Sequence, residues 1–208
     1  MIKVFFLIFE PSVAWEKIAQ KRRGFVFITG VHLLPLILLG CALETWGLLR
    51  HGKVGQYDML RVFTPTEIYT FETIQFLLFL AVVFVSALLV YRIALTFQDR
   101  LTFLQAFTTV AYGFSPMFLF HFLDASATIH PFVAWLLGMA VTTWILYQGI
   151  PRVMQPDPTH AFGVYLSSMI VVVLTSGLAR WITAQYLLGK VNFQHSWLSN
   201  EISHILGH

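Results

Sequence analysis

The chain has 208 residues, of which 57% are hydrophobic and 11% are charged, and its formal net charge is +3. Soluble domains carry roughly 25% charged residues, so this composition excludes an ordinary soluble domain and indicates an integral membrane protein. Inside a bilayer, only helices and closed barrels satisfy their own backbone hydrogen bonds. Because the basic residues flank apolar stretches, where they orient helices and meet anionic lipid, the expected partner is the bilayer and no nucleic acid is expected.

The first 23 residues predict a short segment that precedes the membrane spans. The apolar run 1–9 is too short for a secretory signal, so we expect it to be retained. In residues 11–23, Ala14, Trp15 and Ile18 fall on one helical face, opposite charged residues. This pattern predicts an interfacial amphipathic helix. A basic cluster, residues 21–23, then predicts a cytoplasmic N-terminus under the positive-inside rule.

Five apolar stretches predict transmembrane helices at about residues 24–49, 68–97, 103–123, 131–150 and 158–188. Residues 1–208 are therefore expected to form a single all-α domain, a five-helix membrane bundle. Five spans, an odd number, put the two termini on opposite sides of the membrane. The distribution of Lys and Arg favours an N-terminus in the cytoplasm and a C-terminus outside.

Local signals predict how individual helices begin, end and bend. Thr64, Pro65 and Glu67 form a capping-box start for the second span. The fourth span is expected to stop at Pro151, and Asp157 is placed to cap the fifth. Two further prolines, Pro35 and Pro116, lie inside spans and are expected to bend them.

Ionisable residues at membrane depth usually face other helices or water, and they are the first candidates for function. The candidates are His32, Glu44, Glu72, Arg92, His121, Asp124 and Arg180. Glu44 and Glu72 lie near span ends, where a carboxylate is expected to reach water. Arg92 can extend to the headgroups.

His121 and Asp124 are three residues apart, so together they could bind a divalent metal, or the carboxylate could orient the imidazole. The alternative is an aspartate that caps a loop beside a histidine at a helix end. Two ligands do not specify a metal, and none is predicted. Arg180 either approaches the outer interface or pairs with Glu44, Glu72 or Asp124, and such a pair could be functional or structural.

Ala134, Gly138 and Thr142 recur every four residues and form a stripe of small residues on the fourth span. Such a stripe permits close helix contact, either in a homodimer or within the bundle. Common enzyme signatures, including the Walker A loop, the Gly-x-Ser-x-Gly elbow and His-Glu-x-x-His, are absent from the sequence. We therefore expect no enzymatic activity and no cofactor.

Three short motifs resemble those of the Yip1-domain family of membrane proteins. They are Tyr112-Gly113-Phe114-Ser115-Pro116, His130-Pro131 and Tyr147-Gln148-Gly149-Ile150-Pro151. The entry segment at Pro11–Ile18 is also similar. The resemblance implies a five-helix bundle of the bacterial inner-membrane type. Eukaryotic relatives act in vesicle trafficking with small GTPases, largely through a longer N-terminal region that this chain lacks, which puts GTPase binding in doubt.

The expected function is therefore non-enzymatic: a protein that organises membrane or binds other membrane proteins, including a second copy. The residues expected to carry it are the motif positions Tyr112, Ser115, Pro116, Tyr147, Gly149 and Pro151, with the stripe Ala134, Gly138 and Thr142. The alternative is a small transporter or channel. Its polar cavity would be lined by His32, Glu44, Glu72, His121, Asp124 and Arg180. Mutual proximity of these side chains would favour transport.

Overall fold

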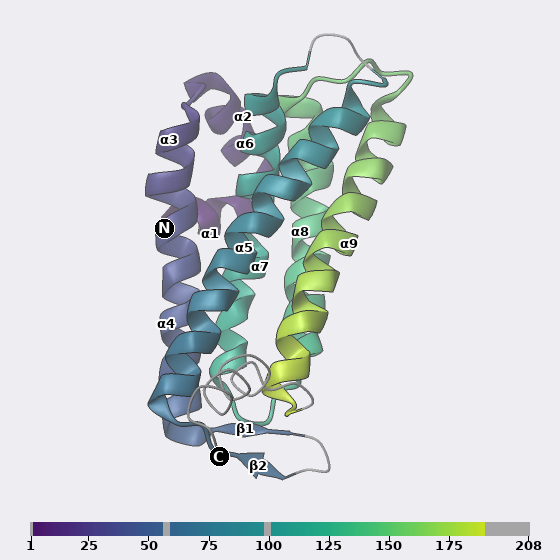
Figure 1. Ribbon diagram of the computed structural model, residues 1–208. Coiled ribbons are helices and arrows are strands. Elements are labelled where there is room, and N and C mark those ends of the chain that lie inside the picture. The colour runs from purple at the N-terminus through teal and green to yellow at the C-terminus, as the bar shows by residue number, and fades with distance from the viewer. Residues whose placement is uncertain (1, 56–58, 98–100, 190–208) are drawn as a thin grey trace, which may run out of the picture.

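The protein is an elongated bundle of helices in a computed structural model that describes residues 2–55, 59–97 and 101–189 (Figure 1). Within those residues, five helical segments are long and apolar enough to cross a membrane. They are Phe25–His51, Pro65–Ala94, Phe103–Ala125, Pro131–Val153 and Ala161–Leu187. The predicted all-α fold with five membrane-spanning helices is confirmed. The polar stretch of sequence that follows Gly189 lies outside the described residues.

The first span is not a uniform α-helix. It consists of α3 (Phe25–Phe27), a π-helical turn η1 (Ile28–Leu33) and α4 (Leu34–His51). Pro35 lies in the first turn of α4, two residues after the end of the π-helical turn at Leu33. Because Pro35 has no N–H group, the regular α-helical hydrogen bonds cannot continue through it, and the wider turn lies where the bonding pattern changes.

The third span is broken into three pieces, and this break shapes the candidate site. Helix α6 (Phe103–Gly113) is followed by α7 (Ser115–Phe120) and by a 3-10 helix η3 (His121–Ala125). The α6–α7 break lies directly before Pro116, as its lack of a backbone donor predicts. In a 3-10 helix, residues three apart lie one above the other. His121 and Asp124 are therefore on the same side of η3.

The ends of the other spans agree with the predictions at one position and differ at two. Helix α5 (Pro65–Ala94) begins with the predicted capping box of Thr64 and Glu67. Helix α8 (Pro131–Val153) continues past Pro151, since the lost donor affects only its last turn. Helix α9 (Ala161–Leu187) is not capped by Asp157, whose Oδ1 accepts hydrogen bonds from Thr159 in the preceding turn.

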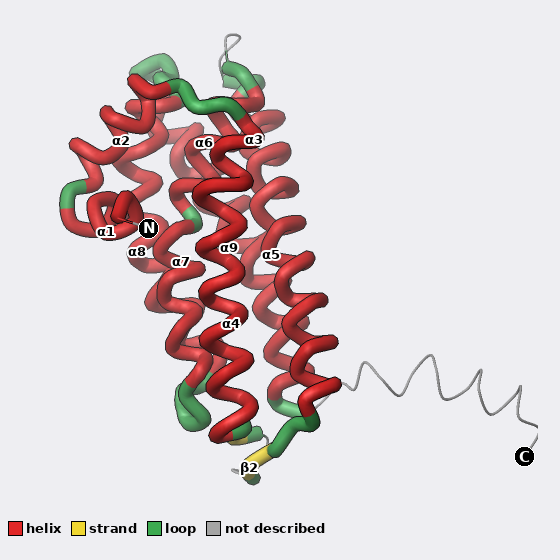
Figure 2. Tube along the Cα trace, turned by 90° about the vertical axis from the view of Figure 1, so that its left-hand side faces the viewer, coloured by secondary structure: helices red, strands yellow, loops and turns green. Residues whose placement is uncertain are grey.

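Two short N-terminal helices pack on the side of the bundle (Figure 2). They are α1 (Ile2–Phe9), which was not predicted, and the expected amphipathic helix α2 (Pro11–Lys21). The Trp15 side chain is fully buried, and its Nε1 donates a 3.0 Å hydrogen bond to the carbonyl oxygen of Ile145 in α8. A Cβ at Gly149 would lie 2.4 Å from the Trp15 ring, so glycine permits this contact. Helix α2 therefore buries its apolar face against the protein.

A short hairpin closes the opposite end of the bundle from α2 (Figure 1). Strand β1 (Lys53–Val54) pairs antiparallel with β2 (Leu60–Arg61), with Lys53 opposite Arg61. No strand was predicted between the first and second spans. The hairpin turns Lys53 into the protein, where the side chain is 1% exposed.

Candidate functional site

Seven polar side chains gather inside the bundle near its hairpin end. Each is buried, and they come from α4, β1, α5, η3 and α9. This charged cluster consists of Glu44, Lys53, Glu72, Gln75, His121, Asp124 and Arg180. Buried charges are expensive unless they are paired and hydrogen-bonded, so the contacts within the cluster decide what it can do.

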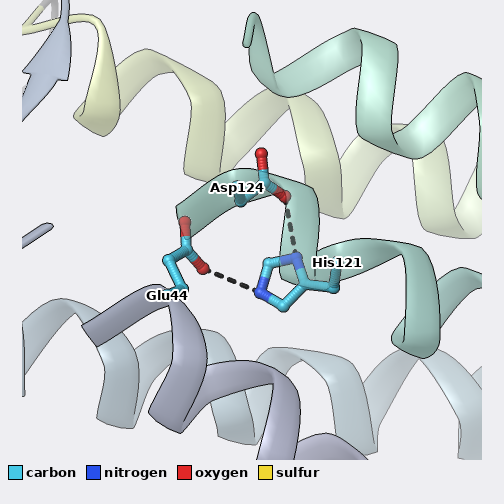
Figure 3. Close-up of side chains that lie close together, drawn as sticks. All are labelled: Glu44, His121 and Asp124. Carbon is cyan, nitrogen blue, oxygen red and sulfur yellow. Dashed lines mark ion pairs between the residues drawn. The ribbon is translucent and has the colours of Figure 1, made fainter. Parts of the chain in front are cut away.

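His121 lies between two carboxylates, one at each ring nitrogen (Figure 3). Its Nε2 is 2.7 Å from Oε2 of Glu44, and its Nδ1 is 2.9 Å from Oδ2 of Asp124. The carboxylate of Asp124 fixes the orientation of the ring, and Nε2 is directed toward Glu44 in the first span. The imidazole thus connects η3 with α4.

Two basic side chains also form ion pairs with Asp124. Arg180 Nη2 is 2.5 Å from its Oδ1, and Lys53 Nζ is 3.8 Å from the same oxygen. Arg180 additionally donates to the carbonyl oxygen of Pro131, at 2.9 Å from Nε and 2.7 Å from Nη2. Lys53 donates to the carbonyl oxygens of Asp124 and Ser126, both at 2.9 Å. The two cations therefore hold both the Asp124 carboxylate and the backbone around it.

Gln75 of α5 occupies the other side of His121. Its amide Nε2 lies 2.5 Å from Glu44 Oε2, 3.0 Å from His121 Nε2 and 3.4 Å from Glu72 Oε2. Buried polar side-chain atoms without a hydrogen-bond partner include Glu44 Oε1, Glu72 Oε1 and Gln75 Oε1. Acceptor atoms thus outnumber donors on this side of the cluster.

Close backbone packing brings α4 against the third span at the cluster. A Cβ at Gly47 would lie 2.2 Å from the carbonyl oxygen of Ala125, and a Cβ at Gly40 would lie 3.1 Å from Cδ2 of His121. Glycines at these two positions let the helix carrying Glu44 approach η3. A chain with larger residues there could not bring Glu44 and His121 to hydrogen-bonding distance without a shift of the backbone.

The cluster contains three carboxylates, of Glu44, Glu72 and Asp124, against two basic side chains, Lys53 and Arg180. One further positive charge balances it, either a proton shared around His121 and the two glutamates or a bound cation. Lys53 lies outside the membrane spans, and its burial lowers the pKa of its ammonium group below the usual 10.5, against the opposing attraction of Asp124.

A small cavity of about 20 Å³ adjoins the cluster. Its lining includes His121, Asp124 and Arg180 on the polar side, and Trp135 and Phe79 on the apolar side. That volume is enough for about one water molecule. The cluster thus has room for a proton carrier or a small ion beside it, and not for an organic solute.

A second, larger cavity lies at the other end of the bundle, where α2 meets the start of α6 and the end of α8. Its volume is about 360 Å³. Three arginines contribute to its lining: Arg22, Arg23 and Arg152. We call it the basic cavity.

The structure brings together most of the predicted polar residues, including two that were expected elsewhere. Glu44 and Glu72 are 0% and 6% exposed, in contrast to the expectation that they reach water. Arg180 pairs with Asp124, as one of the alternatives proposed. His32 lies apart from the cluster, 2.8 Å from Oγ of Ser115 and close to the Tyr112 ring. Arg92 is exposed.

Two members of the cluster were not predicted. Lys53 lies between the first two expected spans, where no element was predicted, and no local signal shows that a hairpin turns it inward. Gln75 had a detectable signal, because it follows Glu72 by three residues in an otherwise apolar helix and therefore shares its face. An amide beside a carboxylate in a membrane span could have been singled out on that ground.

Most of the motif and stripe residues are buried and pack inside the bundle. Ala134, Gly138 and Thr142 are buried, and a Cβ at Gly138 would lie 2.8 Å from Cα of Met117 in α7. This placement is that of internal packing. Of the motif positions, Tyr112, Ser115, Pro116 and Gly149 are buried, whereas Tyr147 and Pro151 are exposed.

Comparison with protein families agrees with this architecture. The sequence matches the Yip1 domain over residues 5–179. The chain belongs to the Yip1 domain family. No curated protein and no solved structure gives a significant match. The match thus runs from within α1 through most of α9 and includes six of the seven members of the charged cluster, with Arg180 one residue beyond it. The chain is a multi-pass membrane protein in contact with the lipid bilayer.

Proposed function

We propose that this Yip1-domain protein is a non-enzymatic inner-membrane protein that organises its membrane surroundings by binding the headgroups of anionic phospholipids. The observation that carries the proposal is the basic cavity, where three arginines meet beside the N-terminal helices. Under the proposed topology, with the N-terminus in the cytoplasm, this cavity opens at the cytoplasmic leaflet, where basic groups attract anionic lipid.

The lining of the basic cavity suits a phosphate group joined to an acyl chain. Arg22 and Arg23 follow α2, and a guanidinium group binds phosphate oxygens in a two-pronged arrangement. Apolar side chains, Ile18 and Leu104 among them, line the same cavity. A volume of about 360 Å³ is within the usual range of small-ligand sites. Polar and apolar lining together match an amphiphile better than a free anion.

The third arginine also joins the cavity to the N-terminal helices. Arg152 Nε lies 3.8 Å from Oε1 of Glu16 in α2, and its Nη1 donates to the carbonyl oxygen of Gln148. A headgroup bound here would contact the end of α2 and the end of α8 at once. We propose that binding steadies α2 on the bundle, and that the exposed Tyr147 on α8 contributes to contacts with other membrane proteins.

Native mass spectrometry of the protein in nanodiscs of mixed phosphatidylglycerol and phosphatidylcholine tests the proposal. The wild-type protein is expected to retain phosphatidylglycerol selectively, and the double variant Arg22→Gln/Arg23→Gln is expected to lose that preference. Arg92→Gln is the matched control, because Arg92 is exposed and does not line the basic cavity. Equal retention of the two lipids by the wild-type protein would overturn the proposal, and retention of free phosphate alone would show an anion site without lipid specificity.

A second candidate is transport of protons or small cations, which the charged cluster favours. Five of the six residues expected to line a transport cavity lie together in the charged cluster: Glu44, Glu72, His121, Asp124 and Arg180. The adjoining cavity restricts any solute to the size of a water molecule or small ion. Proteoliposomes with an internal pH dye test this candidate. Flux that His121→Asn abolishes would support transport, and wild-type flux equal to that of empty liposomes would exclude proton transport.

A further inference from the structure

We propose that Glu44, Glu72 and His121 bind a divalent transition-metal ion, with Gln75 as a fourth ligand. This inference concerns the charged cluster and is independent of lipid binding at the basic cavity. It rests on the acceptor atoms around the Gln75 amide, on the contact between His121 and Glu44, and on buried oxygens without a hydrogen-bond partner.

Three acceptor atoms surround the amide nitrogen of Gln75. Oε2 of Glu44, Nε2 of His121 and Oε2 of Glu72 lie at 2.5, 3.0 and 3.4 Å from it. An amide nitrogen has only two hydrogens to donate. The amide nitrogen thus lies where two carboxylates and an imidazole converge, and a cation held by these three acceptors would lie beside it.

The contact between His121 and Glu44 also calls for a positive charge. If Nδ1 donates its hydrogen to Asp124, then Nε2 carries a lone pair that faces Oε2 of Glu44 at 2.7 Å. Two acceptor atoms at that separation repel unless a proton or a metal ion lies between or beside them. A metal ion would accept the lone pairs of both atoms.

Asp124 fits the role of a residue that orients a metal ligand. A histidine that binds a metal through one nitrogen usually donates the other N–H to a carboxylate. Here Oδ2 of Asp124 lies 2.9 Å from Nδ1, on the side of the ring away from Glu44 (Figure 3). Arg180 and Lys53 hold that carboxylate in place and leave it less available as a ligand.

Buried oxygens that have no hydrogen-bond partner are available as further metal ligands. Oε1 of Glu44, Oε1 of Glu72 and Oε1 of Gln75 have no hydrogen-bond partner, and these side chains are 0, 6 and 0% exposed. Rotation of the Gln75 amide by half a turn about its last bond exchanges its nitrogen for its oxygen. That exchange places an oxygen ligand where the amide nitrogen now lies.

The ligand set indicates which metals fit. Two carboxylates, one imidazole and one amide oxygen suit Mn²⁺, Fe²⁺ or Zn²⁺, whereas Cu⁺ prefers sulfur ligands. Ligand atoms of Glu44, His121 and Asp124 all lie within 4.8 Å of one another, and Glu72 is not in that group. The Glu72 carboxylate therefore has to turn toward Glu44 and His121 to complete the proposed site. The ion would also balance the excess of carboxylates in the cluster.

Metal content measured by equilibrium dialysis tests the proposal. The full chain is purified in detergent, stripped with a chelator, dialysed against Zn²⁺ or Mn²⁺, and analysed by mass spectrometry of the elements. Wild-type protein is expected to bind one ion per chain, and Glu72→Gln is expected to weaken binding at least about tenfold. Glu10→Gln is the control, since Glu10 is exposed and makes no side-chain cap contact. No ion bound by the wild-type protein would overturn the proposal.

Glu72→Gln keeps the size of the side chain and every histidine of the chain, so metal bound at surface histidines is the same in variant and wild type. Without metal, the variant is expected to unfold at a higher temperature than the wild type, because one of two neighbouring buried carboxylates is gone. Added metal should raise the unfolding temperature of the wild type and not of the variant. Equal metal-induced shifts in both proteins would contradict the site, and retention of phosphatidylglycerol should not change in this variant.

Discussion

Arg180 of α9 and Asp124 of η3 form a buried ion pair, with Nη2 and Oδ1 2.5 Å apart and side chains that are 4% and 1% exposed. The same guanidinium donates to the carbonyl oxygen of Pro131, at the start of α8. One side chain thus joins the third, fourth and fifth spans. The Arg180 guanidinium thus balances the buried charge of the Asp124 carboxylate and at the same time connects three helices.

Arg180→Met should strongly destabilise the bundle, because it leaves the Asp124 carboxylate and the Pro131 carbonyl buried with fewer donors. Removal of one partner from a buried pair typically costs about 3–5 kcal/mol of unfolding free energy. Thermal unfolding in detergent, followed by tryptophan fluorescence, measures the loss. Arg92→Met is the control, because Arg92 is exposed and should change stability little. Similar unfolding temperatures for the two variants would show that the ion pair contributes nothing net.

Composition and helix-capping signals predict the bundle well because they are local. The apolar stretches give the five spans within a few residues, and the capping box at Thr64 and Glu67 marks the start of α5. In contrast, the α6–α7 break and the 3-10 turn at His121 follow from Pro116 only in part, since the tighter turn also depends on packing against α4. That turn is what places His121 and Asp124 together.

Long-range placement limits what the sequence shows of the site. Glu44 lies near a span end, where a carboxylate ordinarily reaches water, and its burial depends on Gly47 allowing α4 to approach Ala125. Lys53 enters the cluster because a hairpin of two-residue strands turns it inward. Strands of two residues are too short to show a periodic pattern in the sequence. Those contacts arise from tertiary packing and not from any window of the sequence.

Gly47→Ala should separate α4 from η3. A Cβ at this position would lie 2.2 Å from the carbonyl oxygen of Ala125, which is backbone and cannot rotate away. Overpacking of this kind costs about 1–3 kcal/mol. We expect reduced stability together with weaker metal binding by Glu44 and His121. Gly30→Ala serves for comparison, since nothing lies within 4 Å of a Cβ there. Wild-type stability of the Gly47 variant would contradict the close approach.

Lys53→Met should destabilise the hairpin end, because the carbonyl oxygens of Asp124 and Ser126 lose a buried donor. The expected cost is about 1–3 kcal/mol. The effect should depend on pH. Burial lowers the pKa of Lys53 in the folded protein, so between that pKa and 10.5 the unfolded chain holds a proton that the folded chain lacks. The stability that depends on Lys53 ionisation therefore rises with pH through this interval.

Chemical unfolding of wild type and Lys53→Met at a series of pH values from neutral to about 10.5 measures this difference. The unfolding free energy of the wild type should rise relative to that of the variant across the interval. A difference that stays constant with pH would show that Lys53 has the same affinity for its proton in both states.

Gly149→Ala should release α2 from the bundle while leaving the five spans in place. A Cβ at Gly149 would lie 2.4 Å from the Trp15 ring, and the adjacent indole donates to the carbonyl oxygen of Ile145. The ring is fully buried. Displacement of α2 would expose Trp15, which a red shift of its fluorescence and faster proteolysis near Arg22 would report.

Since Arg22 and Arg23 follow α2 directly, phosphatidylglycerol retention at the basic cavity should fall in the same variant. Gly163→Ala is the matched control, because a Cβ there meets only the edge of the Phe97 ring at 3.4 Å. Unchanged fluorescence and lipid retention in Gly149→Ala would mean that α2 is held by other contacts than the one Trp15 makes with α8.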